Sequence, residues 1–173
     1  ASSALLPSWL VAAASLSFLV ALAATAAREI VAGKNHRNLR IVVLVSLLAV
    51  AQIAFHVEAA VTGQTVYAPR FGIAAVILLI SVVGGRIIPS FTTNWLMRQP
   101  AGVMPKQFSR YDDATLAISA IALVLWGALP ALPAVLADAV SGVLALSGLM
   151  QGWRLIRWAP HRTGAEALVW LLH

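Results

Sequence analysis

Apolar residues occur in long, nearly uninterrupted runs along this chain. Five runs reach the length of about twenty residues that a helix needs to cross a hydrocarbon layer of about 30 Å. They cover residues 5–27, 39–61, 71–97, 114–132 and 135–153. None shows the period-two alternation of a membrane strand, so each run predicts a helix. The pattern indicates an all-α, polytopic membrane helical bundle with five full transmembrane helices.

A sixth apolar segment begins near residue 164 and continues to residue 173, which gives it about nine residues. We expect it to be the start of a sixth transmembrane helix, since a full span needs about twenty. The sequence also begins without a methionine. We therefore predict a single transmembrane helical domain over residues 1–173 that belongs to a longer chain and packs against its remaining helices.

Composition agrees with a membrane protein, because 61% of the residues are apolar and only 10% are charged, against about a quarter in soluble domains. The net charge is +6, but the charges form short clusters between apolar runs, which argues against nucleic acid as a partner. The expected partner is a lipid bilayer. The absence of cysteine excludes thiolate metal sites, so any metal here needs histidine, carboxylate or methionine ligands.

The distribution of basic residues predicts the orientation. Ten of the twelve lysines and arginines lie in or beside three loops, at residues 28–40, 98–110 and 154–162. Basic loops stay on the cytoplasmic side of a membrane. We therefore expect these three loops in the cytoplasm and Ala1 on the outside.

The sequence GGRIIPSFTTNW, at residues 84–95, breaks more local rules than any other segment. Gly84 and Gly85 loosen a helix, and Pro89 removes a backbone donor, so this segment predicts a kinked or broken third helix. Arg86 lies about 24 Å along that helix at a rise of 1.5 Å per residue. Because a charge is costly on a lipid face, its side chain should point into the bundle or a wet cavity.

Arg86, Ser90 and Asn94 follow one another at intervals of four residues. This spacing places them on one face of a helix and predicts a polar stripe toward its cytoplasmic end. Three roles for Arg86 remain open. It could bind backbone carbonyls freed by the proline or reach the membrane surface, balance a bound anion such as a haem propionate, or line a solute path.

Two histidines fall within predicted spans. His56 follows Gln52 by one turn, so it is either hydrogen-bonded across helices or a ligand of haem iron or copper. His173 lies about 14 Å into the sixth segment at 1.5 Å per residue. The similar depth of His56 and His173 leaves room for a shared cofactor. No motif of a soluble enzyme is present, so the sequence leaves catalysis open.

Three segments carry a resemblance to a known family. GGRIIPSFTTNWL, at residues 84–96, resembles the signature of the NnrS family of bacterial inner-membrane proteins. RNLRIVVLVSLLAVAQIAFH, at residues 37–56, and ALVWLLH, at residues 167–173, resemble other parts of that family more loosely. The resemblance extends over essentially the whole chain and implies a central fragment of a protein with about twelve spans.

The resemblance implies an association with haem and copper and a role in the bacterial response to nitric oxide and nitrosative stress, often beside denitrification genes. It leaves open whether nitric oxide is turned over, bound or only sensed. By this resemblance His56 and His173 are candidate metal ligands, and Arg86 is the charge beside the cofactor. The alternative is a solute or ion transporter that uses the broken third helix, since interrupted helices with buried charges are typical of transporter sites.

Overall fold

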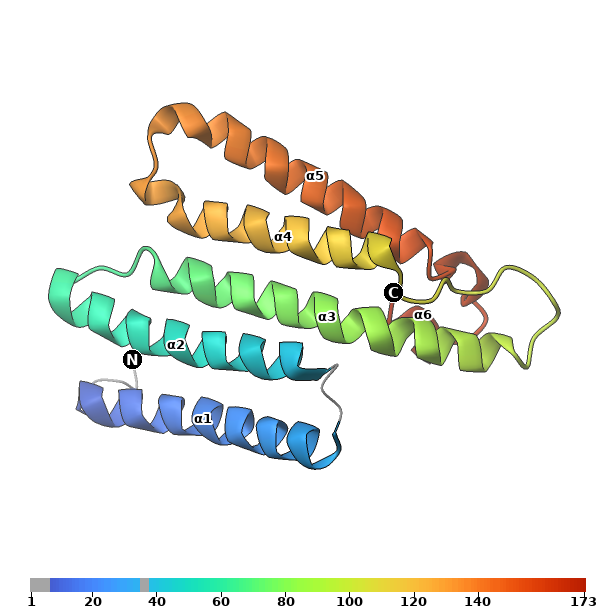
Figure 1. The fold of residues 1–173 in the computed structure, drawn as a ribbon, viewed down its shortest axis with the longest axis horizontal. Helices are drawn as coiled ribbons and strands as arrows, with labels where there is room; N and C mark the ends of the chain where they lie inside the picture. Colours follow the sequence, from blue (N-terminus) through green and yellow to red (C-terminus); the bar gives the residue numbers. More distant parts are fainter. Residues whose placement is uncertain (1–6, 35–37) are drawn as a thin grey trace. The chain divides into compact units, whose positions relative to one another are not determined.

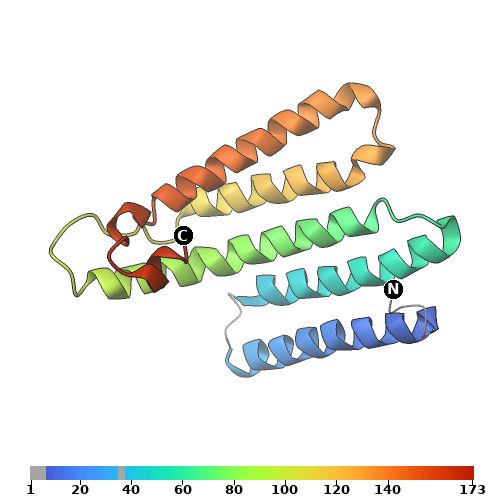
Figure 2. The same cartoon turned by 180° about the vertical axis from the view of Figure 1, so that it is seen from behind.

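The computed structural model describes residues 7–34 and 38–173, and all regular elements in this part of the chain are helical (Figures 1 and 2). The helices are α1 (Ser8–Ala32), α2 (Leu39–Thr62), α3 (Ala68–Leu96), α4 (Arg110–Ala128), α5 (Ala137–Ile156) and the single turn α6 (Ala167–Trp170). Three short 3₁₀ turns are η3 (Leu129–Ala131), η4 (Ala134–Leu136) and η5 (Pro160–Arg162). The predicted all-α class is confirmed.

Five helical segments are long and apolar enough to cross a membrane, which confirms the five predicted spans. At most 28% of the apolar window of any of them is buried within the chain. Exposed side chains include Phe18, Ile80 and Leu149. Such surfaces need lipid or further protein to cover them, so the chain is a multi-pass membrane protein.

The observed helices differ from the predicted spans mainly at their ends. Residues 5 and 6 of the first predicted span lie outside the described residues. In the last segment the structure has one helical turn, α6, so the sixth span stays a prediction. Helices α3 and α4 each begin a few residues before their predicted starts, because side chains bind the backbone there.

The chain forms two compact units, and α3 contributes to both. The first unit takes in the chain up to Leu79 together with Gly127–Ala131, and the second contains Ile80–Trp126 and Leu132–His173. In the first unit α1 and α2 pack side by side (Figures 1 and 2). In the second, α4 and α5 lie side by side, and η4 directly precedes α5.

The start of α3 is fixed by a carboxylate from the end of α2. The side chain of Glu58 accepts hydrogen bonds from the backbone N–H groups of Val66, Tyr67 and Ala68 at 2.9, 3.0 and 2.9 Å. These groups have no partner within a helix at its first turn, and a negative charge there also favours the helix dipole. The chain reverses at Gly63, whose φ of +69° favours glycine. Glu58 therefore holds the α2–α3 turn.

Helix α3 runs without interruption from Ala68 to Leu96, through Gly84, Gly85 and Pro89. The prediction of a broken third helix is therefore wrong. A proline inside a helix removes one hydrogen bond and crowds the carbonyl four residues earlier, which here belongs to Gly85. A glycine at that position lets the backbone adjust, so the helix passes the proline intact.

We predict that Glu58→Ala lowers the thermal unfolding temperature of the protein in detergent, because three backbone donors lose their acceptor. Glu58→Gln should give a smaller decrease, since an amide oxygen still accepts but carries no charge. The matched control is Glu29→Ala, which removes an exposed carboxylate from α1 in the same unit. Equal decreases for Glu58→Ala and Glu29→Ala would contradict the capping role.

Candidate functional site

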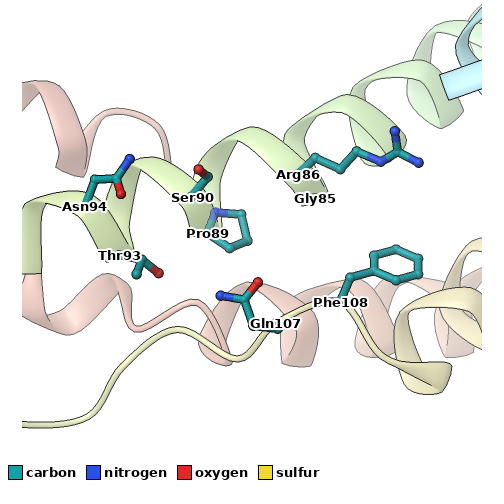
Figure 3. Close-up of a pocket in the computed structure, with 8 residues that line it drawn as sticks. All are labelled: Gly85, Arg86, Pro89, Ser90, Thr93, Asn94, Gln107 and Phe108. Atoms are coloured by element: carbon teal, nitrogen blue, oxygen red, sulfur yellow. The ribbon is translucent and has the colours of Figure 1, made fainter. Parts of the chain in front are cut away.

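A polar pocket of about 380 Å³ lies beside α3 in the second unit (Figure 3). Its wall includes all three residues of the predicted polar stripe. Six lining residues come from α3 and two from the segment before α4: Gly85, Arg86, Pro89, Ser90, Thr93, Asn94, Gln107 and Phe108. The predicted kink residues Gly85 and Pro89 are thus pocket residues, whereas Gly84 is not among the lining set.

The side chains in this pocket point in different directions. Arg86 extends along α3 toward its N-terminal half, whereas Thr93 lies on the side that faces Gln107 (Figure 3). Arg86 is half-buried, and Ser90 and Asn94 are exposed. The hydroxyl oxygen of Thr93 is buried and has no hydrogen-bond partner in the structure. The pocket therefore combines one cation with hydroxyl and amide groups.

The buried arginine of this unit is Arg154 on α5, whose exposed fraction is 1%. Its Nε donates to Asp112 Oδ1 at 2.9 Å, and its Nη1 donates to the backbone carbonyl of Ser81 at 3.0 Å. The guanidinium also lies 5.2 Å from the ring centre of Trp158. One cation thus joins α3, α4 and α5. The sequence predicts Arg154 as a charge in the loop after the fifth span, whereas the structure places it in the last turn of α5 and buries it.

Gly85 is the residue that lets Arg154 approach α3. A Cβ atom at this position would collide with Nη2 of Arg154 and come within 2.8 Å of its Cζ. Gly85 is also one of the residues that line the pocket. The glycine therefore permits a close contact with a charge, a role beyond the loosening of the helix that its sequence context predicts.

Asp112 binds a second arginine through its other oxygen. Its Oδ2 accepts from the backbone N–H and the hydroxyl of Ser109, at 2.8 and 2.9 Å, and lies 3.5 Å from Arg157 Nη2. The guanidinium of Arg157 lies 4.6 Å from the ring centre of Tyr111. Ser109 and Asp112 form half of a capping box, which explains why α4 starts at Arg110.

A line of polar side chains continues from this ion pair into the helices. Gln151 accepts from Arg154 Nη1 at 3.4 Å and donates to the hydroxyl of Ser119 at 3.0 Å. The hydroxyls of Ser119 and Ser147 are 2.8 Å apart. Both serines are buried. Lipid and apolar side chains offer no hydrogen-bond partners to buried polar groups. These side chains therefore bind one another.

His56 lies in the first unit and is bound across α1 and α2. Its Nε2 is 3.2 Å from the amide nitrogen of Gln52, which also donates to the hydroxyl of Ser15 at 3.1 Å. The ring meets Phe55 edge-on at 5.5 Å between centres. The structure thus gives His56 the partners of a helix-bridging histidine, one of the two roles left open by the sequence.

His173 lies in the second unit, outside the five spans. Its Nε2 is 3.0 Å from the hydroxyl oxygen of Thr92, which is fully buried. Its Nδ1 is buried and has no partner in the structure. Burial lowers the pKa of His173 below the ordinary value and so favours the neutral imidazole. A neutral imidazole with one nitrogen fixed by a hydrogen bond is the form that binds metals.

The two candidate metal ligands, His56 and His173, belong to different units. Among the described residues there is no group of three or more histidines and carboxylates that could hold a metal ion. A haem iron can be held by a single protein ligand. A single histidine with a buried ring nitrogen therefore fits an axial bond to haem.

Comparison with curated proteins and with solved structures gives no match. Comparison with protein families does: the family described as NnrS protein matches residues 1–173, the whole of the chain. The same range contains the pocket, the buried arginine and both histidines. The chain therefore belongs to the NnrS family.

Proposed function

We propose that this chain is part of a haem-associated membrane protein that acts in the bacterial response to nitric oxide or nitrosative stress. The observation that carries the proposal is the family match along residues 1–173. It is supported by the five membrane-crossing helices and by histidines suited to an axial haem bond. Copper is the second metal implied by the resemblance.

His173 is the better candidate for the haem ligand. One of its ring nitrogens is buried without a partner, and the other is held by Thr92. His56 is the second candidate, but its Nε2 would first have to lose Gln52. When bound, haem supplies an iron that can bind nitric oxide. Thr92 would orient the imidazole, and Arg86 would balance a carboxylate of the cofactor.

We also propose that the protein lies in the bacterial inner membrane with the start of this chain outside. The positive-inside distribution of the basic residues supports this orientation. The contacts of the basic segments agree with it. Arg162 donates to the carbonyls of Pro100 and Val103 at 2.7 and 2.8 Å, which brings two of the three proposed cytoplasmic segments together.

A solute or ion transporter is the second candidate. The polar pocket beside α3 and the buried polar line through Gln151 support it. The uninterrupted α3 removes the broken helix on which this alternative first rested. Uptake of labelled ions or small solutes by proteoliposomes separates the two candidates, because a haem protein that does not transport shows no uptake above empty vesicles.

We predict that His173→Ala abolishes or shifts the Soret band of the purified protein, because the axial ligand is removed. Thr92→Val should keep the band but weaken haem binding by about tenfold, since a hydrogen bond to the ligand's other nitrogen is lost. Optical titration with haem measures both effects.

The control is His161→Ala, which removes an exposed histidine of the same unit and should leave the spectrum unchanged. His56→Ala tests the second candidate ligand. Unchanged spectra in both His56→Ala and His173→Ala would remove these residues as ligands.

We predict opposite compartments for the two ends of α3. Alkaline phosphatase, which is active only outside the cytoplasm, should be active when fused after Gln64 and inactive when fused after Gly102. Green fluorescent protein at the same two positions should give the reverse pattern. Activity of the phosphatase at Gly102 but not at Gln64 would invert the proposed orientation.

A further inference from the structure

The connection between α3 and α4 is basic. Residues 97–110, which we call the basic loop, read MRQPAGVMPKQFSR and contain three cations and no carboxylate. The cations are Arg98, Lys106 and Arg110, and all three residues are exposed. Among the described residues their side chains have no hydrogen bond or ion pair. A concentration of exposed positive charge attracts negatively charged partners.

The basic loop also exposes apolar side chains. Met97 and Val103 are 69% and 65% exposed, and Met104 and Phe108 are each 40% exposed. A group of exposed large apolar side chains marks a contact with protein or membrane. Cations next to apolar side chains suit the membrane interface, where the apolar groups enter the acyl boundary and the cations stay at the headgroups.

The start of α4 marks one edge of the hydrocarbon layer. The span that begins at Arg110 has 22 residues, which is just enough to cross a core of about 30 Å at 1.5 Å per residue. Arg154 binds Asp112 in the first turn of this span and lies against Gly85 of α3. Gly85 therefore lies near the same edge.

Helix α3 continues past this edge. It has 11 further residues after Gly85, up to its end at Leu96, and these make about 16 Å of helix. The basic loop leaves that end and returns to the start of α4 (Figures 1 and 2). The headgroup region on each side of the core is about 5–8 Å thick. The basic loop therefore has to cross the headgroup layer.

Arg162 fixes the shape of the basic loop. Its guanidinium donates to the carbonyls of Pro100 and Val103 at 2.7 and 2.8 Å. Gly102 permits this contact, because a Cβ atom there would come within 2.7 Å of Cζ of Arg162. A loop that is already ordered loses little conformational entropy when it binds a partner. Its exposed side chains are therefore held ready for contact.

We propose that the basic loop is a binding surface for anionic phospholipid, with its three cations at the headgroup phosphates and its exposed apolar side chains at the acyl boundary. A dissolved anion would leave those apolar side chains in water. An acidic protein would have to displace lipid from a loop that lies in the headgroup layer. The proposal does not depend on haem or on nitric oxide.

The test measures thermal unfolding of the full-length protein in detergent as phosphatidylglycerol or the zwitterionic phosphatidylcholine is added. A ligand that binds the folded state raises the unfolding temperature. We expect phosphatidylglycerol to stabilise the wild type more than phosphatidylcholine does. The double variant Arg98→Gln/Lys106→Gln should weaken the apparent affinity for phosphatidylglycerol about 25-fold, since each cation near an anionic surface contributes about fivefold.

The matched control is Arg28→Gln/Lys34→Gln, which removes two exposed cations from the first unit. Its affinity for phosphatidylglycerol should stay close to that of the wild type. An equal loss in both double variants would indicate a general attraction between a basic protein and anionic lipid, and it would overturn the assignment to the basic loop. Because all four side chains are exposed, both variants should unfold at the wild-type temperature without added lipid.

A further variant, Met104→Gln, distinguishes a lipid from a dissolved anion. It keeps every cation of the basic loop, so it should not change any effect of inorganic phosphate. It should weaken the affinity for phosphatidylglycerol about fivefold, because part of an apolar side chain no longer leaves water. The proposal fails if phosphatidylcholine or inorganic phosphate stabilises the wild type as strongly as phosphatidylglycerol does, or if Met104→Gln has no effect on phosphatidylglycerol.

Discussion

The ion pair between Arg154 and Asp112 is the interaction on which the second unit depends. Arg154 contacts α3 through the carbonyl of Ser81 and α4 through Asp112, so one guanidinium on α5 connects three helices. Apolar packing alone does not select helix partners in lipid, because lipid tails are as apolar as leucine. A buried charge does select them, since removing one member of such a pair costs about 3–5 kcal/mol.

Residues next to this ion pair also contribute to the pocket. Gly85 lets the guanidinium lie against α3, and Ser109 holds the carboxylate at the start of α4. Gln107 and Phe108, the other wall of the pocket, directly precede that serine. A hydrogen bond from Lys106 N to the carbonyl of Arg157, at 3.0 Å, fixes the same segment to the end of α5. The segment that forms this wall is thus held by contacts with α4 and α5.

The sequence was sufficient to predict the helical class and the five spans, because membrane helices require apolar length and little else. It also grouped Arg86, Ser90 and Asn94, which line one pocket. It did not identify Arg154, because a basic residue at the end of a span looks like a loop charge, and the partner Asp112 lies 42 residues earlier. The S-x-x-D pattern of Ser109 and Asp112 was the available signal, since it places the start of α4 at the carboxylate.

The contact between Glu58 and the start of α3 is local in sequence, since its acceptor and donors are separated by only eight to ten residues. It can therefore form once α2 and α3 have both been synthesised, before α4 and α5 exist. The two helices would then enter the bilayer as a preformed hairpin, in which the backbone N–H groups of the turn already donate to Glu58. By contrast, the contacts of Arg154 with Ser81 and Asp112 can form only after α5 has been synthesised. The N-terminal and C-terminal halves of α3 therefore acquire their partners at different times during biogenesis.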